Sequence, residues 1–206
     1  MHRRVLADAQ INLLPLIKVF SGAFFLAGGT AVALHIGHRR SIDFDLFTAE
    51  EIHRIRLRNR IQAEGFSIQG VLYEAFDQMH LLVNSVKLTF FSFPYPIPHP
   101  VDFEGIITVP ALLDLAAMKA FTLVGRAKWK DYVDMYYILK DHYDVQHISS
   151  RAREIFGQEF NEKLFREQVC YFDDIDYSEK VEYLGNAPGD EAIKQFLSDA
   201  ATAAFR

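Results

Sequence analysis

The sequence predicts an α/β (α+β) fold with a helical C-terminal part, and three observations support this prediction. Short segments rich in β-branched and aromatic residues, typical of strands, fall within the first 92 positions. From residue 110 onward, apolar residues recur instead at helical spacing. Residues 93–100 contain four of the seven prolines, which block both a helix and a central strand. We therefore expect an α/β part at 1–100 and a helical part at 101–206, joined by an extended strap.

The individual elements follow from local patterns. Thr48-Ala-Glu-Glu51 fits a capping box, which predicts a helix running to about Glu64, where Gly65 ends it. Pro110 suits the first turn of a second helix that ends near Gly125. The expected strands are 23–26, 42–47, 67–73, 80–83 and 86–92, and the further expected helices are 129–140, 149–172 and 191–204.

Composition excludes several classes of protein. With 50% apolar residues, 11 glycines and 7 prolines, the chain is not disordered, collagen-like or of low complexity. The longest uncharged stretch, 19–34, is shorter than the ~20 apolar residues of a membrane helix, and polar residues interrupt any secretory signal. The single cysteine, Cys170, excludes internal disulfides and thiolate zinc clusters. We expect a cytoplasmic protein without a membrane segment.

Charge is unevenly distributed along the chain. The net charge of −5 argues against a generally basic nucleic-acid-binding surface. Four arginines nevertheless alternate in one short segment, at Arg54, Arg56, Arg58 and Arg60. They indicate either a solvated helix face or a surface for RNA or polyphosphate. The acidic stretch 171–191 should repel nucleic acid.

Two motifs in residues 25–47 suggest chemistry. An apolar strand leads into Gly28-Gly29-Thr30 and a helix, an arrangement that suits phosphate binding or simply a tight turn. Asp43 and Asp45 alternate, so both carboxylates should point to one face of a strand. Two like charges so placed repel unless a cation lies between them, and Mg²⁺ prefers such oxygen ligands. The alternative is a solvated acidic row on an amphipathic strand.

Other candidate sites are weaker. His35 and His38 are one helical turn apart, but no cysteine or carboxylate follows at zinc-site spacing. His38 could instead meet a phosphate. Ser41 is not in a nucleophile-elbow sequence, so nothing supports a Ser-His-Asp hydrolase. Asp134 lies four residues after Lys130, where a surface salt bridge is as good an interpretation as any functional role.

The two motifs together resemble a known family. The segment 26–31 (LAGGTA), followed by His38, Arg39, Ser41 and Asp43-Phe-Asp-Leu-Phe47, is similar to the AbiEii/AbiGii nucleotidyltransferase toxins of type IV toxin–antitoxin systems. A second block, 114–119 (DLAAMK) with Arg126 and 130–136 (KDYVDMY), resembles that family's second motif, and 171–174 (YFDD) its late acidic segment. The resemblance spans about residues 24–174.

The resemblance implies a polymerase-β-like core, a mixed sheet with flanking helices, and a C-terminal part that completes the active-site cleft. The implied reaction moves an NMP from an NTP to a hydroxyl of RNA, tRNA especially, or of a protein. A cognate antitoxin is an implied partner. The implied residues are Asp43 and Asp45 for Mg²⁺ or Mn²⁺; Gly28, Gly29, Thr30, His38, Arg39 and Ser41 for the nucleotide; Lys119 for the triphosphate; and Asp131 as orienter or additional acid.

One departure affects catalysis. The wider superfamily commonly places a third carboxylate on a later core strand, whereas the matching stretch, 86–91, contains no acid and has Thr89 there. This leaves the general base unassigned. The alternative function is therefore a catalytically degenerate nucleotide-binding or interaction module of the same fold.

Overall fold

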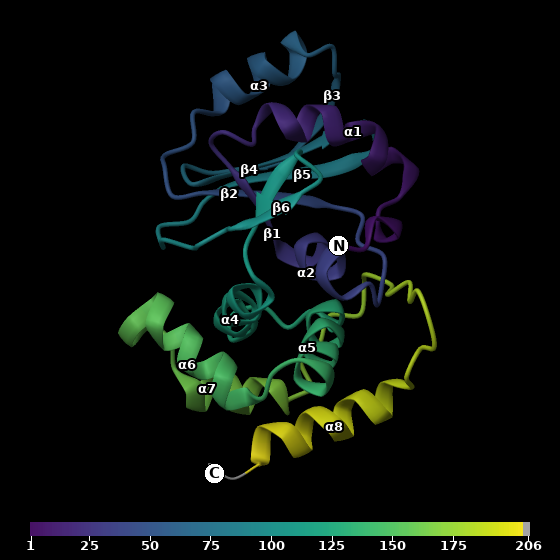
Figure 1. Ribbon diagram of the computed structural model, residues 1–206, viewed down its shortest axis with the longest axis vertical. Coiled ribbons are helices and arrows are strands. Elements are labelled where there is room, and N and C mark those ends of the chain that lie inside the picture. Colours follow the sequence, from purple (N-terminus) through teal and green to yellow (C-terminus); the bar gives the residue numbers. More distant parts are fainter. Residues whose placement is uncertain (204–206) are drawn as a thin grey trace. The chain divides into compact units, whose positions relative to one another are not determined.

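The computed structural model describes residues 1–203 and divides into two compact units, Met1–Ala111 (unit 1) and Leu112–Arg206 (unit 2) (Figure 1). Unit 1 contains a five-stranded mixed sheet with flanking helices, and unit 2 is helical. The predicted α/β class is confirmed. The proline-rich segment lies inside unit 1, because two further strands follow it before the boundary between the units.

The sheet of unit 1 has the strand order β1-β2-β5-β4-β3. Only β2 and β5 run parallel; the other neighbours are antiparallel. A separate hairpin is formed by β6 and β7. The elements of unit 1 are η1 (Arg3–Val5), α1 (Asp8–Val19), β1 (Phe25–Ala27), α2 (Gly28–Ile36), β2 (Phe44–Thr48), α3 (Arg54–Ala63), β3 (Ile68–Glu74), β4 (Gln78–Val83), β5 (Val86–Ser92), β6 (Val101–Phe103) and β7 (Ile107–Val109).

The two faces of this sheet differ in burial. Alternate residues such as Phe44, Leu46 and Phe90 are fully buried on one face. On that face, the ring of Phe20 at the end of α1 meets Phe90 edge-on, with 4.9 Å between ring centroids. Helices α1 and α3 lie on the same side of the sheet (Figure 1). The residues between the buried ones therefore point to the other, more open face.

Three local predictions in unit 1 differ from the structure. The capping box is wrong: Thr48 is the buried last residue of β2, its hydroxyl accepts a hydrogen bond from the Glu50 amide, and α3 begins only at Arg54. Helix α1 was not predicted from the sequence, because polar residues and Pro15 interrupt its apolar pattern. The β6–β7 hairpin was not predicted either, because its strands have only three residues each.

Unit 2 is built around α4, which packs against α5, α6 and α7, while α8 packs on α5 and α7. The elements are α4 (Leu112–Leu123), α5 (Trp129–Asp141), α6 (Val145–Phe156), η2 (Gly157–Glu159), α7 (Glu162–Val169) and α8 (Asp190–Thr202). The single helix expected at 149–172 is wrong. Gly157, with φ +58°, breaks it, and the Asn161 side chain caps the new helix by accepting from the Leu164 amide. The expected end of the last helix, Ala204, lies outside the described residues.

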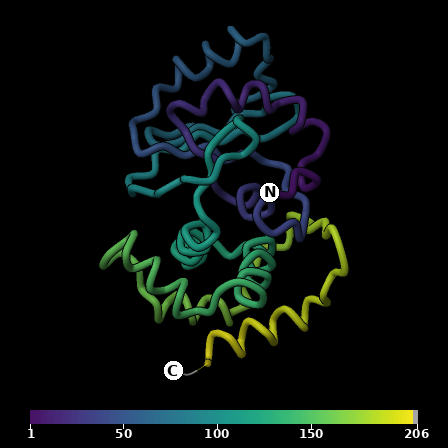
Figure 2. Tube along the Cα trace, in the orientation of Figure 1, coloured from purple at the N-terminus to yellow at the C-terminus, as the bar shows by residue number. Residues whose placement is uncertain are grey.

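A long segment, 170–189, links α7 to α8 (Figure 2). Backbone hydrogen bonds attach it to the start of α5: the Trp129 amide donates to the Asp176 carbonyl at 3.1 Å, and the Asp176 amide to the Ala127 carbonyl at 2.8 Å. The carboxylate of Glu179 pairs with both Lys128 and Lys130. The acidic segment is therefore partly neutralised by α5. Within residues 1–203, no helix is long and apolar enough to cross a membrane.

Candidate active site

The two acids of the first motif lie where β2 begins. Asp43 immediately precedes the strand and Asp45 is its second residue, and both are partly exposed. Their neighbours Phe44 and Leu46 are fully buried. Alternation along the strand therefore directs the Asp45 carboxylate to the more open face of the sheet, and we expect the Asp43 carboxylate, one residue before the strand, on the same face.

Asp45 contacts the glycine turn directly. It pairs with Ala27 of β1, the residue before Gly28. Gly28 has φ +67°, a conformation that favours glycine, and a Cβ built on it would come within 3.0 Å of Asp45 Cγ and closer still to Oδ2. The carboxylate thus lies against the bare backbone at the start of α2. Glycine is required here by both its conformation and its size.

The rest of the turn is held by buried polar side chains. A Cβ on Gly29 would lie 2.7 Å from Nη2 of Arg39, whose side chain is only 3% exposed. The Thr30 hydroxyl lies 2.8 Å from the Ser41 hydroxyl and also contacts the carbonyl oxygen of Asp43. Thr30 is fully buried, so its hydroxyl connects the first turn of α2 to the chain entering β2. Arg39, Thr30 and Ser41 thus lie against the glycine turn and the chain entering β2.

Two further residues complete this corner of unit 1. His38 is buried, as are Arg39 and Ser41 in the loop before β2. Gln10, which sequence reasoning missed, is 1% exposed, and its Nε2 donates to the Asp43 carbonyl at 3.2 Å. Its Oε1 accepts from the Ala7 amide at 3.0 Å, so it ties α1 to the chain entering β2. A polar residue near the N-terminus carried no local signal for this contact.

A histidine that sequence reasoning also missed lies on the same face. The register pairs Asp45 with Thr89 of β5, and Thr89 with His80 of β4. Burial and the charge of Lys87 lower the pKa of His80 below its ordinary value of 6.5, while Asp45 opposes this shift. The alternating pattern of β4 placed His80 on the open face, but only strand pairing could place it in line with Asp45.

The second motif forms a buried charged cluster within unit 2. Lys119 Nζ lies 2.8 Å from Asp131 Oδ1 and 2.8 Å from Asp134 Oδ2. The side chains are 7%, 6% and 0% exposed, respectively. Arg126 Nη2 lies 3.0 Å from Asp131 Oδ2 and is 56% exposed. Although burial acts to raise it, Lys119 and Arg126 hold the pKa of Asp131 below its ordinary value.

This cluster corrects one interpretation of the sequence. Asp134 is fully buried and bound to Lys119, so a purely surface salt bridge at Asp134 is wrong. Lys130 pairs with Glu179, which lies in the segment that links α7 to α8. The first residue of the motif, Asp114, accepts from Arg151 Nε at 2.6 Å and so joins α4 to α6.

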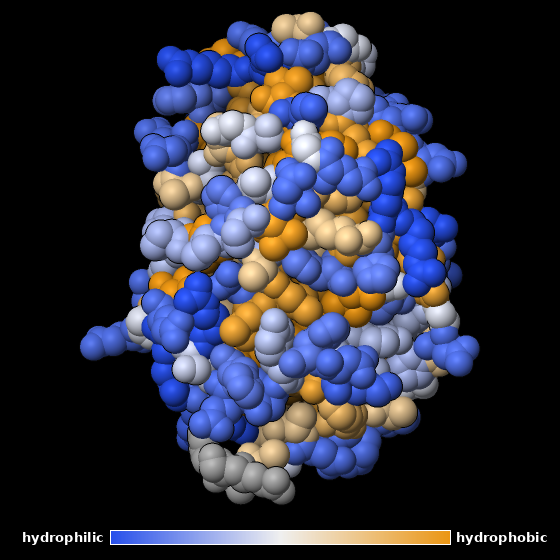
Figure 3. All heavy atoms as spheres, in the orientation of Figure 1, coloured by the Kyte–Doolittle hydropathy of each residue, from blue (hydrophilic) through white to orange (hydrophobic). Residues whose placement is uncertain are grey.

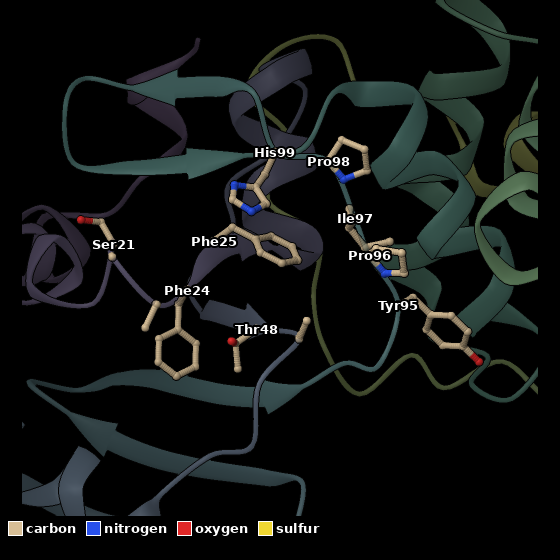
Figure 4. Close-up of a pocket in the computed structure, with 12 residues that line it drawn as sticks. Ser21, Phe24, Phe25, Thr48, Tyr95, Pro96, Ile97, Pro98 and His99 are labelled. Carbon is tan, nitrogen blue, oxygen red and sulfur yellow. The ribbon is translucent and has the colours of Figure 1, made fainter.

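A pocket of unit 1 lies away from this corner. A pocket of about 460 Å³ opens at the Phe25 and Thr48 ends of β1 and β2, away from Gly28 (Figure 4). The proline-rich segment forms one wall, and the His99 ring stacks on Phe25 with 4.7 Å between centroids. Among the described residues that line it, none carries a carboxylate, so it does not suit a metal-bound triphosphate.

The residues present fit a divalent cation at the first motif. Mg²⁺ usually binds one or two protein carboxylates and completes its shell with water and substrate phosphates. Asp43 and Asp45 supply two partly exposed carboxylates where β2 begins, beside a backbone that lacks a side chain at Gly28. Across residues 1–203, no group of three or more His, Cys, Asp or Glu side chains is arranged to bind a metal. Two protein carboxylates would leave the other coordination positions of the cation to water and substrate phosphates.

Solved structures share this fold. MenT4, a nucleotidyltransferase toxin of Mycobacterium tuberculosis H37Rv, is similar with a TM-score of 0.66 and 14% identity, over 94% of this chain and 82% of that one. A Helicobacter pylori protein described as a candidate nucleotidyltransferase is similar with a TM-score of 0.61 and 15% identity, over 94% and 92% of the two chains. The mixed sheet with flanking helices is therefore the nucleotidyltransferase fold.

Sequence comparison carries the family assignment. An uncharacterized protein of Aquifex aeolicus (strain VF5) is 29% identical over 155 residues, which are 73% of this chain and 74% of the relative. A family model described as "Nucleotidyl transferase AbiEii toxin, Type IV TA system" matches residues 17–201. Since that match includes both motifs and most of the chain, the resemblance is confirmed: the chain belongs to the AbiEii family of nucleotidyltransferase toxins.

Proposed function

We propose that the protein transfers a nucleoside monophosphate from an NTP to a hydroxyl group of an acceptor, with Mg²⁺ or Mn²⁺ as cofactor and pyrophosphate as leaving group. One observation carries this proposal. Asp43 and Asp45 are both partly exposed where β2 begins, and the Asp45 carboxylate lies against the bare backbone of Gly28. A pair of carboxylates beside a glycine turn suits a metal-bound triphosphate.

The chain's own residues divide the work. Asp43 and Asp45 would hold the cation, which when bound neutralises charge on the phosphates and activates an oxygen nucleophile. Gly28 and Gly29 leave room for the Asp45 carboxylate and the Arg39 guanidinium against the turn, and the first amides of α2 would bind the triphosphate. Buried Thr30 and Ser41 fix the turn through their mutual hydrogen bond. Preorganised positioning of this kind supplies most of the catalysis in phosphoryl transfer.

The family resemblance also implies roles for other residues, and we keep these as proposals. His38 and Arg39 would assist nucleotide binding, Lys119 would contact the triphosphate, and Asp131 would orient it. The Lys119 ammonium is already bonded to two buried carboxylates. A loss of activity in a Lys119 variant would therefore count as evidence for its role only if the melting temperature is retained.

RNA is the acceptor that the charge pattern favours over a protein, and the family resemblance implies tRNA in particular. Helix α3 carries four arginines, and hydrophilic atoms lie among hydrophobic ones at the top of the view (Figure 3). Glu74 pairs with Arg54 and Arg58, and Glu64 with Arg60. Arg56 is exposed. Exposed basic side chains suit the RNA backbone.

We also place the activity in the cytoplasm, where a cognate antitoxin would restrain it.

Incubation with each labelled NTP tests the proposal. The purified protein is mixed with Mg²⁺ or Mn²⁺ and total cellular RNA, beside an Asp43→Ala/Asp45→Ala variant. We expect label to reach RNA or protein with the wild-type chain and not with the variant. Transfer that persists in the variant would contradict the assignment of the two acids. A matched control, Asp8→Ala/Asp199→Ala, removes two carboxylates outside the site and should transfer label normally.

The missing third acid favours a second candidate function, a degenerate nucleotide-binding module. Strand β5 presents Thr89 beside Asp45, where a carboxylate would be expected. This candidate predicts metal-dependent NTP binding without turnover. Binding measured by titration calorimetry, together with an absence of labelled product from any NTP, would favour it over the transferase.

A further inference from the structure

Three residues form a row across the open face of the sheet. Asp45 on β2 is the direct partner of Thr89 on β5, and Thr89 is the direct partner of His80 on β4. Residues directly opposite each other on neighbouring strands point to the same face. The row therefore runs from a metal-binding carboxylate, through a hydroxyl, to an imidazole. Tyr73 on β3 is the partner of His80 and lies next to this row.

The hydroxyl in the middle of this row is unusual. Thr89 is 6% exposed, and its Oγ1 is buried without a hydrogen-bond partner among residues 1–203. Buried hydroxyl groups are bonded in the great majority of cases, so an exception calls for a ligand or a water. Its position beside Asp45 indicates an oxygen of a bound substrate.

The imidazole is oriented by its own strand. Nε2 of His80 lies 3.0 Å from Oε1 of Gln78, and an amide oxygen only accepts hydrogen bonds. A hydrogen bond donated by Nε2 to this oxygen leaves the lone pair of the neutral ring on Nδ1. The Tyr73 ring packs beside the imidazole, with 5.4 Å between centroids.

Burial and the charge of Lys87 both favour the neutral form of His80. Lys87 on β5, Asp45 on β2 and Tyr73 on β3 are the titratable groups that surround it. Burial, together with Lys87, lowers the pKa of His80 in spite of Asp45. Strand β5 separates His80 from β2, so the imidazole is not one of the cation's ligands. A neutral imidazole can accept a proton near pH 7.

Resting on the proposed function, we propose that Thr89 and His80 form the acceptor subsite. The Thr89 hydroxyl forms a hydrogen bond with the attacking oxygen of the acceptor, and His80 accepts the proton of that oxygen. The O–H bond of the acceptor breaks and its proton goes to Nδ1 of His80, while the oxygen forms a bond to the α-phosphorus. The bond from the α-phosphorus to the bridging oxygen of the β-phosphate breaks, and pyrophosphate leaves. His80 thus supplies the base that a third carboxylate would otherwise provide.

The test compares two variants with a matched control. His80→Phe keeps a ring against Tyr73 but removes both nitrogens. Thr89→Val keeps the shape but removes the hydroxyl. His53→Phe changes an exposed histidine of the same unit. For each protein, the rate of label transfer is measured from pH 5.5 to 9, together with Mg²⁺-dependent NTP binding and the melting temperature.

We expect His80→Phe to slow transfer about 100-fold or more, the usual contribution of a general base, with NTP affinity within twofold of wild type. The fall in wild-type rate toward acid pH should disappear from its profile. In a further variant, His80→Ala, added imidazole should partly restore the rate of transfer. Thr89→Val should slow transfer about 5- to 10-fold without lowering the melting temperature, because no hydrogen bond within residues 1–203 is lost.

Two results would overturn the inference alone: a His80→Phe protein with the wild-type rate and pH profile, or a variant that loses NTP binding in proportion to transfer. An inactive wild-type protein would instead overturn the proposed function, and this inference with it. The control His53→Phe should match the wild type in every measurement.

Discussion

The Asp45 carboxylate lies against the Cα of Gly28, in the space that any side chain at that position would occupy. Asp45 is the partner of Ala27 in the β1–β2 ladder, so strand pairing fixes this contact. The glycine turn and the acidic pair, separated in sequence, therefore form one structural feature. A change in either should affect both folding and metal-dependent binding.

Gly28→Ala tests this relationship. The positive φ of Gly28 should cost an alanine about 1–2 kcal/mol in the free energy of unfolding, and the methyl group must also displace Asp45. We expect lower stability in urea denaturation and weaker Mg²⁺-dependent NTP binding. Gly70→Ala is the control, because a Cβ there meets nothing within 4 Å. Equal behaviour of the two variants would contradict the contact.

Lys119→Met should destabilise unit 2. The substitution leaves the fully buried Asp134 without its ammonium partner, while Asp131 keeps Arg126. Breaking a buried ion pair on one side costs about 3–5 kcal/mol, and a fall of this size should appear in chemical denaturation. Lys163→Met, which changes an 83% exposed side chain, should be nearly neutral. Adding Asp134→Asn to Lys119→Met should restore part of the stability; failure to do so would contradict the pairing.

The contribution of Asp131 to the stability of the protein should fall in acid. Its pKa is lower in the folded state than the ordinary 3.8, so the folded state binds the proton less readily than the unfolded state does. The stabilisation by Asp131 is therefore complete above about pH 4 and is lost as the pH falls through the folded pKa. In urea denaturation between pH 7 and pH 3, the gap between wild type and Asp131→Asn should narrow in acid. A constant gap would contradict the shift.

Arg56→Glu should weaken RNA binding selectively. Arg56 is exposed, and no ion pair is recorded for it within residues 1–203, so its reversal breaks no salt bridge of α3. We expect lower RNA affinity in fluorescence anisotropy, a salt dependence reduced by about one charge, and unchanged NTP binding. Lys163→Glu on α7 is the control. Equal loss of RNA and NTP binding would argue against an acceptor surface on α3.

Thr89→Asp should create the third carboxylate that β5 lacks. Beside Asp45, the new charge should lower the melting temperature without metal, because like charges on paired strands repel. Added Mg²⁺ should then raise the melting temperature more than it does in the wild type. Thr89→Asn, nearly identical in shape but uncharged, is the control. If Thr89→Asp gains no more than Thr89→Asn from Mg²⁺, Thr89 does not face the cation site.

Much of the site was predictable because its signals are local. The alternation of Asp43 and Asp45 with buried Phe44 and Leu46 requires only the two-residue period of a strand. The other features depended on distant partners. Nothing near Gln10 in sequence indicates its bond to the Asp43 carbonyl. The sequence left Asp134 open between a surface salt bridge and a functional role, whereas the structure buries it against Lys119.

The same contrast explains the fold. Strands β3, β4 and β5 were expected from their composition, and α5 from its apolar period. The prediction was wrong at Thr48, because a side chain that suits a helix cap is used instead in the β2–β5 ladder. It was wrong again across Gly157, where the positive φ ends one helix before the next begins.

By itself, the sequence determined the α/β class, the acidic pair, the glycine turn and the family, because each depends on residue type and short spacing. Only the tertiary structure decided that Asp45, Thr89 and His80 lie in one row, that Thr89 Oγ1 lacks a partner within the described chain, and that Lys119 is bonded to two buried carboxylates. Strand order and helix packing join residues far apart in the chain, and no local pattern specifies which of them meet.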